Sequence, residues 1–304
     1  MKGNNVMINQ PLVTGIITTY KRKPEIVVRA AKSVLNQTYK NIELIVVDDS
    51  PADFYLRRSV ESSIRALGEN IQYILHEVNQ GACAARNTGL LAARGEFVAY
   101  LDDDDEWMPT KLEKMLPFFS NKDIGLVYCG STVYNEITGE SNYFYQKFIR
   151  GNVYDQMLTF NYIGSTSFPI MRRELLLRIN GFDPLMKSCQ DYDVWLRLAR
   201  ICSFEYTEEA LVRYHTHGGE QISKNYSNVV SGHLRIIEKN KKALYNNKKA
   251  YNSQLLMLVD GYAGVAQYWN CTKTYLKAVI KAPQNIYENL RGLYAVFNTI
   301  MGRR

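Results

Sequence analysis

The first 130 residues alternate between short apolar runs and longer segments with helical spacing. The apolar runs predict strands at 13–19, 42–49 (IELIVVDD), 71–75, 96–101 and 124–130. Between them, the pattern predicts helices at about 24–37, 53–67 and 81–95 and another after Pro109. Gly81 and Gly95 are the expected ends of the third helix, with Gly95 at its C′ position. This alternation is typical of an α/β fold with an open, mostly parallel central sheet flanked by helices.

The periodicity weakens after residue 132 and helical spacing returns later. The aromatic segment TVYNEITGESNYFYQKF at 132–148 is hairpin-like, and we expect an insertion that covers the crevice of the sheet. Helical spacing resumes in QDYDVWLRLARI at 190–201 and dominates beyond residue 226. The sequence therefore predicts an α/β body followed by a helical C-terminal extension.

Composition and charge narrow the class of protein. With 304 residues, 46% of them hydrophobic and 12% aromatic, the chain can bury a substantial core in one or two domains. The formal net charge is +7, and it is uneven: residues 225–304 contain 12 Lys and Arg against Glu238, Asp260 and Glu288. Such a basic region suggests an anionic partner, either a membrane surface or nucleic acid, although a solvated helical face has the same signature.

The spacing of the cysteines and the length of the apolar runs indicate the cellular compartment of the protein. The five cysteines are widely spaced and form no C-x-x-C pair, so neither a zinc cluster nor a disulfide framework is indicated. The first ten residues lack the apolar stretch of a signal peptide, and no apolar run reaches the ~18 residues that span a bilayer. We expect a cytoplasmic protein that is at most peripheral to a membrane.

Acidic residues follow two of the predicted strands where each ends. Asp48 and Asp49 end the second strand, and 102–105 (DDDD) end the fourth, so both groups should face one crevice. At ~4 Å, two like charges repel by about 1 kcal/mol in water and by about 4 at an effective dielectric constant of 20, so a cation should lie among them. If the strand stays extended, Asp102 and Asp104 share a face. Carboxylate oxygens favour Mg²⁺ or Mn²⁺ as the bound ion. The alternative to a metal site is that these residues are solvated loop acids, one of which caps the helix at Pro109.

Four motifs follow one another along the chain: VTGIITTYKR, SVLNQTYKNIELIVVDDS, NQGACAARNTGLLAARGEFVAYLDDDDEW and SCQDYDVWLRLA. In this order they resemble the family 2 glycosyltransferases, which are inverting enzymes with the GT-A fold and nucleotide-sugar donors. The resemblance implies a GT-A catalytic domain over 1–223, with a nucleotide-binding half at about 12–131 and an acceptor-side half at about 132–223. Residues 224–304 remain as a helical region that associates with a membrane or a subunit.

The resemblance also implies the donor site. The matching positions are Thr18, Tyr20 and Asp49 for the nucleotide base and ribose, Arg86 for the diphosphate, Asp102 and Asp103 for ribose and sugar, and Asp104 for Mn²⁺ or Mg²⁺. In RYHTHGGEQIS, His217 fits the family's histidine beside the metal or diphosphate better than His215 does. The alternatives are helix capping for Asp49, packing for Tyr20, a solvated position for Arg86 and a structural role for the histidines.

The last of the four motifs, SCQDYDVWLRLA, implies which residues would act on the acceptor. Asp191 matches the catalytic base, although Gln190 replaces the commoner Glu. Val194, Trp195 and Leu198 give the following helix an apolar face that would anchor this base. The alternatives are an N-cap role for Asp191 and Asp193 as the base. The segment GFDPLMKSC should line the acceptor side, with Asp183 either as a contact or as a turn residue.

The implied activity is hexosyl or N-acetylhexosaminyl transfer from a UDP-sugar to a glycan or polyprenyl-linked acceptor in surface or capsular polysaccharide synthesis. A non-catalytic sugar-nucleotide binding module is the alternative, and intact Asp104 and Asp191 disfavour it. A phosphotransferase would need a D-x-D-x-T motif, and a Rossmann dehydrogenase would need G-x-G-x-x-G after the first strand; the sequence has neither. Nucleic-acid binding has only the basic tail in its favour, and we expect none.

Apolar positions recur at helical spacing near the C-terminus, at Ile286, Leu290, Leu293, Phe297, Ile300 and Met301, with Arg291, Arg303 and Arg304 nearby. This pattern predicts a helix that either lies on a lipid surface or packs on the catalytic domain or on a second subunit.

Overall fold

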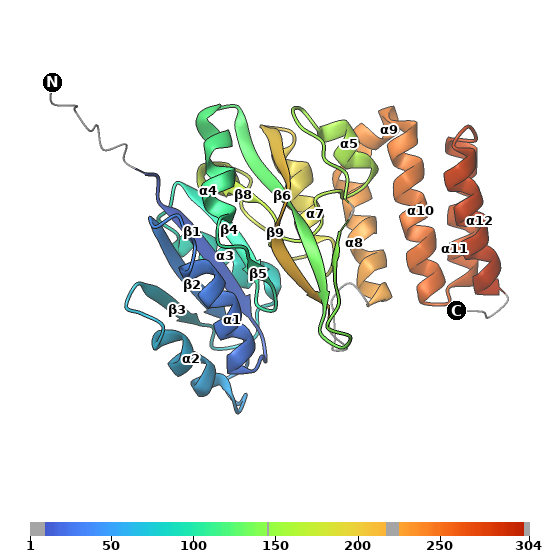
Figure 1. Cartoon of the computed structure of the whole chain (residues 1–304). Coiled ribbons are helices and arrows are strands. Elements are labelled where there is room, and N and C mark those ends of the chain that lie inside the picture. Colours follow the sequence, from blue (N-terminus) through green and yellow to red (C-terminus); the bar gives the residue numbers. More distant parts are fainter. Residues whose placement is uncertain (1–9, 145, 217–224, 301–304) are drawn as a thin grey trace, which may run out of the picture. The chain divides into compact units, whose positions relative to one another are not determined.

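The computed structural model describes residues 10–144, 146–216 and 225–300 (Figure 1). These residues form two compact units. Unit 1 contains residues 10–144, 165–181 and 205–216, and unit 2 contains 146–164, 182–204 and 225–300. The expected domain boundary between residues 223 and 224 lies outside the described residues and stays a prediction.

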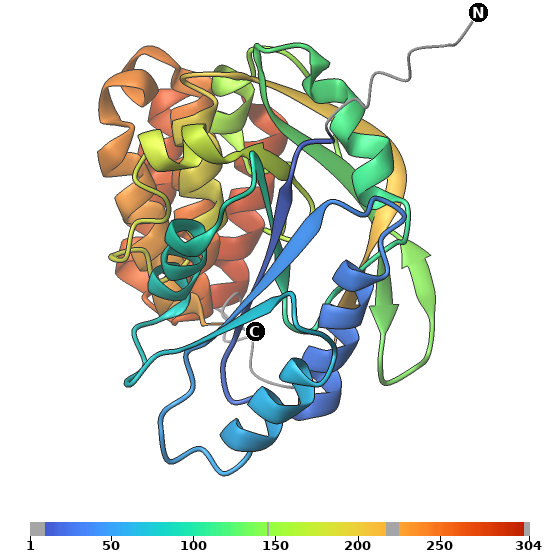
Figure 2. The same ribbon diagram turned by 90° about the vertical axis from the view of Figure 1, so that its left-hand side faces the viewer.

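Four parallel strands form one half of the sheet in unit 1, as the alternating pattern predicts. In spatial order they are β3 (Ile71–Leu75), β2 (Ile42–Asp48), β1 (Val13–Thr19) and β4 (Phe97–Asp102). Thr19 of β1 is in register with Asp48 of β2, and Thr18 is in register with Asp102 of β4. The acidic ends of β2 and β4 therefore lie at the same edge of the sheet, on either side of β1, as expected (Figure 2).

Three helices connect these strands. They are α1 (Pro24–Leu35), α2 (Arg57–Arg65) and α3 (Ala82–Ala92). Helix α1 begins with Pro24, where the absent N–H costs nothing, and its buried face packs on the sheet through Val27, Ala30 and Val34. Helix α2 begins four residues later than expected, because residues 51–56 form turns.

Gly95 does not end α3 in the way the sequence suggests. The helix ends at Ala92 with Ala93 as its C-cap, and Gly95 has no left-handed backbone. A Cβ atom at Gly95 would lie 2.7 Å from Thr14 N and 2.8 Å from Leu12 O. Gly95 is therefore needed for close approach to β1 and not for a helix cap.

The rest of the sheet is more mixed than expected. Beyond β4 it continues through β8 (Ile170–Arg172), β6 (Ile124–Asn135), β9 (Ser203–Thr216) and β5 (Glu106–Trp107), while β7 (Ser141–Tyr143) forms a hairpin with β6. The pairs of β4 with β8, β8 with β6, and β5 with β9 are antiparallel. Short helices α4 (Lys111–Met115), η1 (Leu116–Ser120) and α6 (Arg173–Arg178) complete unit 1.

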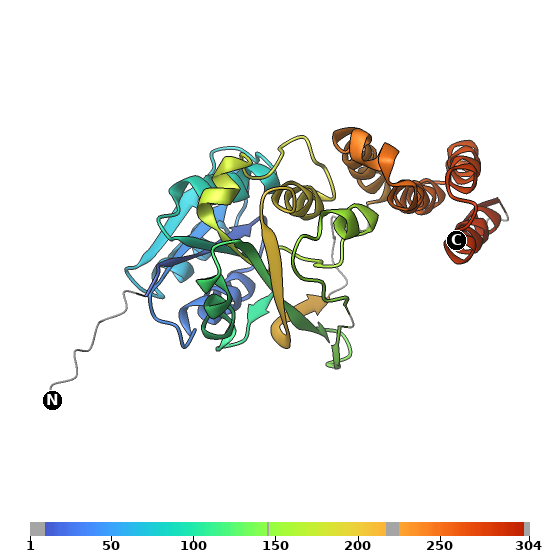
Figure 3. The same cartoon turned by 90° about the horizontal axis from the view of Figure 1, so that it is seen from above.

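Unit 2 is largely helical, as the spacing beyond residue 226 predicts. Its helices are α5 (Tyr154–Thr159), α7 (Gln190–Leu198), α8 (Tyr226–Lys239), α9 (Lys241–Asn246), α10 (Lys248–Gly264), α11 (Tyr268–Lys281) and α12 (Ile286–Ile300). Helices α8, α10, α11 and α12 lie side by side (Figure 3). Leu255, Val259, Cys271 and Ala295 form the core of the last three. None of the described helices combines the length and hydropathy needed to cross a bilayer.

Candidate active site

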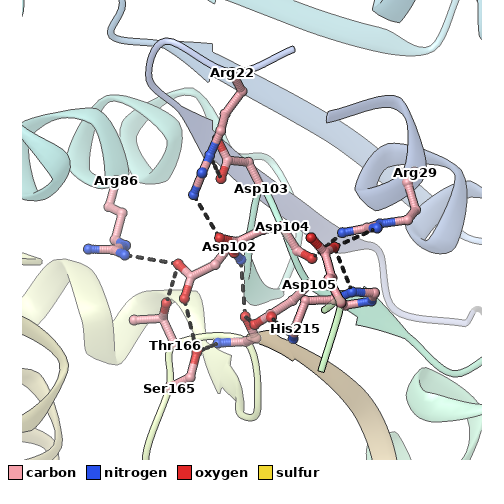
Figure 4. A network of polar contacts seen from close by, with 12 residues as sticks. Arg22, Arg29, Arg86, Asp102, Asp103, Asp104, Asp105, Ser165, Thr166 and His215 are labelled. Atoms are coloured by element: carbon pink, nitrogen blue, oxygen red, sulfur yellow. Dashed lines mark hydrogen bonds and ion pairs between the residues drawn. The ribbon is translucent and has the colours of Figure 1, made fainter. Parts of the chain in front are cut away.

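The candidate site is built around the turn that ends β4. The strand stops at Asp102, and the N–H of Asp105 donates to the Asp102 carbonyl oxygen at 3.0 Å. This hydrogen bond closes a turn over residues 102–105. The strand is therefore not extended through residue 104, and the condition under which Asp102 and Asp104 would share a face is not met. Asp103 and Asp104 share one partner, Arg22, whereas Asp102 has a separate set (Figure 4).

Arg22 bridges two of the four carboxylates. Its Nε donates to Asp103 Oδ1 at 2.9 Å, and its Nη2 donates to Asp104 Oδ2 at 2.7 Å. Burial raises the pKa of Asp103, although Arg22 acts to lower it. Burial alone would lower the pKa of Arg22, but the carboxylates of Asp103 and Asp104 outweigh burial and raise it. The two pKa shifts arise because Arg22, Asp103 and Asp104 form a charge cluster that is mostly buried.

Asp102 is held by one arginine and two hydroxyls. Its Oδ1 accepts from Arg86 Nη2 and from Thr166 Oγ1, both at 3.0 Å, and its Oδ2 accepts from Ser165 Oγ at 3.0 Å. Arg86 comes from α3 and is only 9% exposed, which rules out the solvated alternative for this residue. The guanidinium of Arg86 thus lies at the strand end, where it can bind phosphate oxygens.

Asp105 is a structural member of the turn. It is fully buried, its Oδ2 accepts from Ser167 Oγ at 2.6 Å, and its Oδ1 accepts from the backbone N–H of His215 at 3.1 Å. Burial raises the pKa of Asp105, and the neighbouring carboxylates of Asp102 and Asp104 raise it further. Asp105 therefore anchors the turn to β9 and to the 165–167 loop.

A second layer supports the turn from α1. Nη2 of Arg29 donates to the carbonyl oxygen of Asp104 at 2.8 Å, and its Nη1 lies 3.0 Å from Glu136. The ring nitrogens of His215 lie 3.1 Å from Glu136 and 2.9 Å from Glu106. His215 is 4% exposed and both of its nitrogens face carboxylates, so the structural alternative applies to it. His217 lies outside the described residues.

Two arginines thus act as counter-cations for three of the four carboxylates, so repulsion among these carboxylates does not by itself require a metal. The residues nevertheless fit a divalent ion. No group of three or more His, Cys, Asp or Glu in the described part of the chain forms a ready-made metal site. Mg²⁺ is commonly bound through one or two carboxylates together with substrate phosphates and water, and the part-exposed carboxylates of Asp102 and Asp104 supply such oxygens.

The end of β2 forms a distinct cluster. Asp49 is 3% exposed, and its carboxylate accepts from the backbone N–H groups of Gln80 and Gly81, both at 2.8 Å, and from Asn79 Nδ2 at 3.0 Å. Because α2 begins at Arg57, Asp49 caps no helix there, and the capping alternative is wrong. Asp49 instead fixes the segment that leads into α3.

Thr18 and Tyr20 lie at the end of β1. Thr18 is half-buried between the ends of β2 and β4. Tyr20 is 47% exposed, so packing does not account for its ring. A half-exposed aromatic ring that directly follows β1 can stack on a planar ligand.

The family model for glycosyl transferase family 2 matches residues 14–179 of this chain. The chain belongs to this family. A protein of Escherichia coli K12 that is named for glycosyl transfer in colanic acid biosynthesis, WcaA, is 31% identical over 263 residues, which cover 81% of this chain and 87% of that protein. An uncharacterised glycosyltransferase of Rickettsia typhi is 30% identical over 249 residues, covering 75% and 73% of the two chains.

The crystal structure of S. aureus TarS is similar in fold, with a TM-score of 0.58 at 16% sequence identity. The match covers 84% of this chain, and this chain spans 49% of TarS. Together with the family match, this likeness confirms the expected GT-A fold with a helical C-terminal region. The match to family 2 extends from β1 to the end of α6, so it includes both acidic strand ends.

The implied catalytic base of the family 2 motif lies in unit 2. Asp191 is the second residue of α7, and Asn161 Nδ2 donates to its Oδ2 at 3.1 Å. The N-cap is Cys189, so the N-cap alternative for Asp191 is wrong. Asp193 is 1% exposed and lies 2.7 Å from Arg197 Nη2. An acid that is buried in an ion pair is a poor base, which leaves Asp191 as the candidate.

Two basic side chains and one backbone N–H hold the carboxylate of Asp183. Its Oδ2 accepts from Arg235 Nη2 at 2.8 Å and from Lys239 Nζ at 2.9 Å, and its Oδ1 accepts from the N–H of Leu185. Burial alone would raise the pKa of Asp183, but the donors Lys239, Leu185 and Arg235 outweigh it and lower the pKa to about 2. The expected turn chemistry is present, and the acceptor contact stays a prediction.

Proposed function

We propose that this glycosyltransferase moves a hexosyl or N-acetylhexosaminyl group from a nucleotide diphosphate to a hydroxyl group of a glycan or polyprenyl-linked acceptor, with inversion at the anomeric carbon. The observation that carries the proposal is the acidic turn at the end of β4, with Arg22 and Arg86 on its carboxylates, in a chain that belongs to family 2. An arginine pair beside part-exposed carboxylates suits a ligand that combines phosphate groups with sugar hydroxyls.

The donor would bind along the ends of β1, β2 and β4. The exposed ring of Tyr20 would stack on the base, and Thr18 and Asp49 would border the base and ribose. Arg86 would bind the diphosphate, and Asp102 and Asp103 would face ribose and sugar. UDP is the favoured nucleotide, because uridine is the commonest donor nucleotide of the family that the sequence resembles.

Asp104 would hold Mn²⁺ or Mg²⁺ together with the donor phosphates, and His217 is a further candidate ligand. Such an ion, when bound, would offset the charge that develops on the leaving nucleoside diphosphate. Asp104 suits this role because its carboxylate is part-exposed, unlike that of Asp105.

The acceptor hydroxyl would be activated by Asp191. Its carboxylate takes the hydroxyl proton, the hydroxyl oxygen forms the new bond to the anomeric carbon, and the bond from that carbon to the diphosphate oxygen breaks with its electron pair on the leaving group. Asn161 would orient the carboxylate through its hydrogen bond to Oδ2. General-base assistance of this kind contributes ~10²–10⁴-fold to the rate. Asp183 is the further acceptor-side candidate.

The acceptor belongs to surface polysaccharide synthesis in this proposal, since the E. coli relative is named for colanic acid biosynthesis. The protein would work at the cytoplasmic face of a membrane. Exposed apolar side chains on α11 and α12 support this placement: Trp269, Leu276, Ile280, Ile286, Tyr287, Leu290, Leu293, Tyr294 and Phe297. Residues 268–300 also contain four Lys and Arg and a single acid, Glu288, which suits an anionic lipid surface. A second copy of the chain is the alternative occupant of this face.

Thermal-shift measurements with UDP, GDP and dTDP in the presence of Mn²⁺ test the donor site. We expect UDP to raise the melting temperature, because a ligand that binds only the folded state stabilises it. Asp104→Asn should abolish the Mn²⁺-dependent part of the shift, whereas Asp123→Asn, which changes an exposed acid, should not. An unaltered response of Asp104→Asn would contradict the metal role. Hydrolysis of UDP-sugars by the wild type, with and without Mn²⁺, separates an enzyme from a silent binding module.

A further inference from the structure

Arg22 holds two acids of the turn from a fixed backbone. It lies three residues beyond β1, and the preceding residue, Lys21, has a left-handed backbone with φ 51°. A non-glycine residue in this region is uncommon and marks a constrained position. The N–H of Lys21 donates to Ser50 Oγ at 2.8 Å, which ties this bend to the end of β2. The direction of the Arg22 side chain is therefore determined by the backbone as well as by its acids.

The contacts of Arg22 differ from those of the other cations at the turn. Arg29 donates to the carbonyl oxygen of Asp104 and Arg86 donates to Asp102, whereas Arg22 donates to the carboxylate of Asp104 itself (Figure 4). The side chains of Arg22, Asp103 and Asp104 are 27%, 8% and 18% exposed, so water screens their charges only in part. A cation that approaches Asp104 on its own meets the positive charge of Arg22 on the same carboxylate.

We propose that Arg22 is a built-in counter-cation that prevents the divalent ion from binding to Asp104 unless a nucleoside diphosphate arrives with it. This inference rests on the proposed function, since it takes Asp104 as the ligand of the ion. A diphosphate adds negative charge, which balances the ion, and its oxygens offer the guanidinium of Arg22 a second forked partner. The site thereby keeps the charge of Asp103 and Asp104 partly balanced when it is empty, and it selects the ion together with the donor.

Titration of Mn²⁺ by calorimetry, with and without saturating UDP, tests the inference. The variants are Arg22→Gln, Arg22→Lys and Lys21→Gln. Lys21→Gln is the matched control, because it removes the same charge one residue away, where Nζ lies over the Tyr20 ring. Without UDP, we expect Arg22→Gln to bind Mn²⁺ at least ~tenfold more tightly than the wild type, and Lys21→Gln to stay within ~threefold of it.

Arg22→Lys keeps the charge but loses the fork, so it should bind Mn²⁺ alone with intermediate affinity. If Arg22→Gln does not fold, the comparison of Arg22→Lys with the wild type in the Mn²⁺ titration takes its place. With UDP present, the advantage of Arg22→Gln should shrink or reverse. If the wild type and both Arg22 variants bind Mn²⁺ alone equally well, and all bind it in the presence of UDP, the inference is wrong and the proposed donor site stands. If the wild type binds no Mn²⁺ even with UDP, the proposed metal role fails and the inference fails with it.

Discussion

The Nδ1 atom of His76 lies 2.7 Å from Oδ1 of Asp49. The other ring nitrogen of His76 lies 2.9 Å from Thr88 Oγ1, so one side chain joins the end of β2 to helix α3. His76 is 5% exposed and Asp49 is 3% exposed. The acid that the family resemblance assigns to the nucleotide base is therefore also a structural centre, and its substitution should affect folding as well as binding.

Asp49→Asn tests the structural part of this role. The backbone N–H groups of Gln80 and Gly81 donate to different oxygens of Asp49, and an amide has only one acceptor oxygen. One part-buried N–H then loses its partner, so we expect the free energy of unfolding to fall by about 1–3 kcal/mol in urea titrations. The control is Asp53→Asn at an exposed turn position, which should change it by less than ~0.5 kcal/mol. Equal stability of the two variants would contradict the structural role.

Asp191→Asn and Asp193→Asn separate the base from its neighbour. Loss of the base should lower the turnover of UDP-sugars by ~10²–10⁴-fold while the thermal shift caused by UDP and Mn²⁺ stays unchanged. Asp193→Asn should instead lower stability, by about 1–3 kcal/mol, because Arg197 and Lys239 lose a charged partner. Retained turnover in Asp191→Asn, or its loss in a fully stable Asp193→Asn, would reverse the assignment.

Lys111 should make stability depend on pH. It is fully buried, its Nζ lies 4.4 Å from the centre of the Trp107 ring, and among the described residues it has no hydrogen-bond partner. Burial lowers the pKa of Lys111 to about 8, with the Cys129 thiol nearby. In the unfolded chain the pKa of a lysine is about 10.4. Between pH ~8 and ~10, Lys111 therefore binds more protons in the unfolded chain than in the folded one. The contribution of Lys111 to stability should therefore rise with pH over this window.

Lys111→Met tests this reasoning. At pH 7 the variant should unfold with a free energy that is higher by about 1–3 kcal/mol, because it no longer buries a charged ammonium group without a hydrogen bond. Its advantage over the wild type should shrink as the pH rises from 8 to 10. Lys114→Met is the control, since it removes the same charge from an exposed position near Glu209. A constant advantage of Lys111→Met at every pH would show that Lys111 does not titrate in this window.

The apolar face of α11 and α12 should bind anionic membranes. In a floatation assay, the wild type should rise with vesicles that contain anionic lipid and stay behind with neutral vesicles. A triple variant with Trp269→Ser, Ile280→Ser and Leu290→Ser should bind at least ~tenfold more weakly, since each large apolar side chain contributes about 1.5–3 kcal/mol when buried. Ile137→Ser and Tyr245→Ser, at other exposed positions, are the controls. If the triple variant instead turns a dimer into a monomer, a second copy covers this face.

Local patterns predicted the parallel half of the sheet well. Its strands are continuous apolar runs, and Pro24 marks the start of α1 as expected. The pairing of the later strands depends on contacts between distant parts of the chain. Met171 of β8 pairs with Val98 and with Leu126, and no sequence period encodes such a choice.

The candidate site was predicted only in part, for a similar reason. The acids at 48–49 and 102–105 stand out because they follow strands. Arg22 and Arg86 supply positive charge at the second group, and the divalent ion expected there stays a prediction. Arg22 was missed although it ends the first family motif, because its contact with residues 103 and 104 depends on the bend at Lys21. The hydroxyls at 165–167 were also missed, since they join the turn from more than 60 residues away.

Arg29 holds the backbone of the acidic turn through a group that has no charge to lose. The carbonyl oxygen of Asp104 does not titrate, so protonation of a neighbouring carboxylate leaves this anchor in place. The side chains of the turn can therefore exchange partners while the main chain at residue 104 keeps its contact with α1.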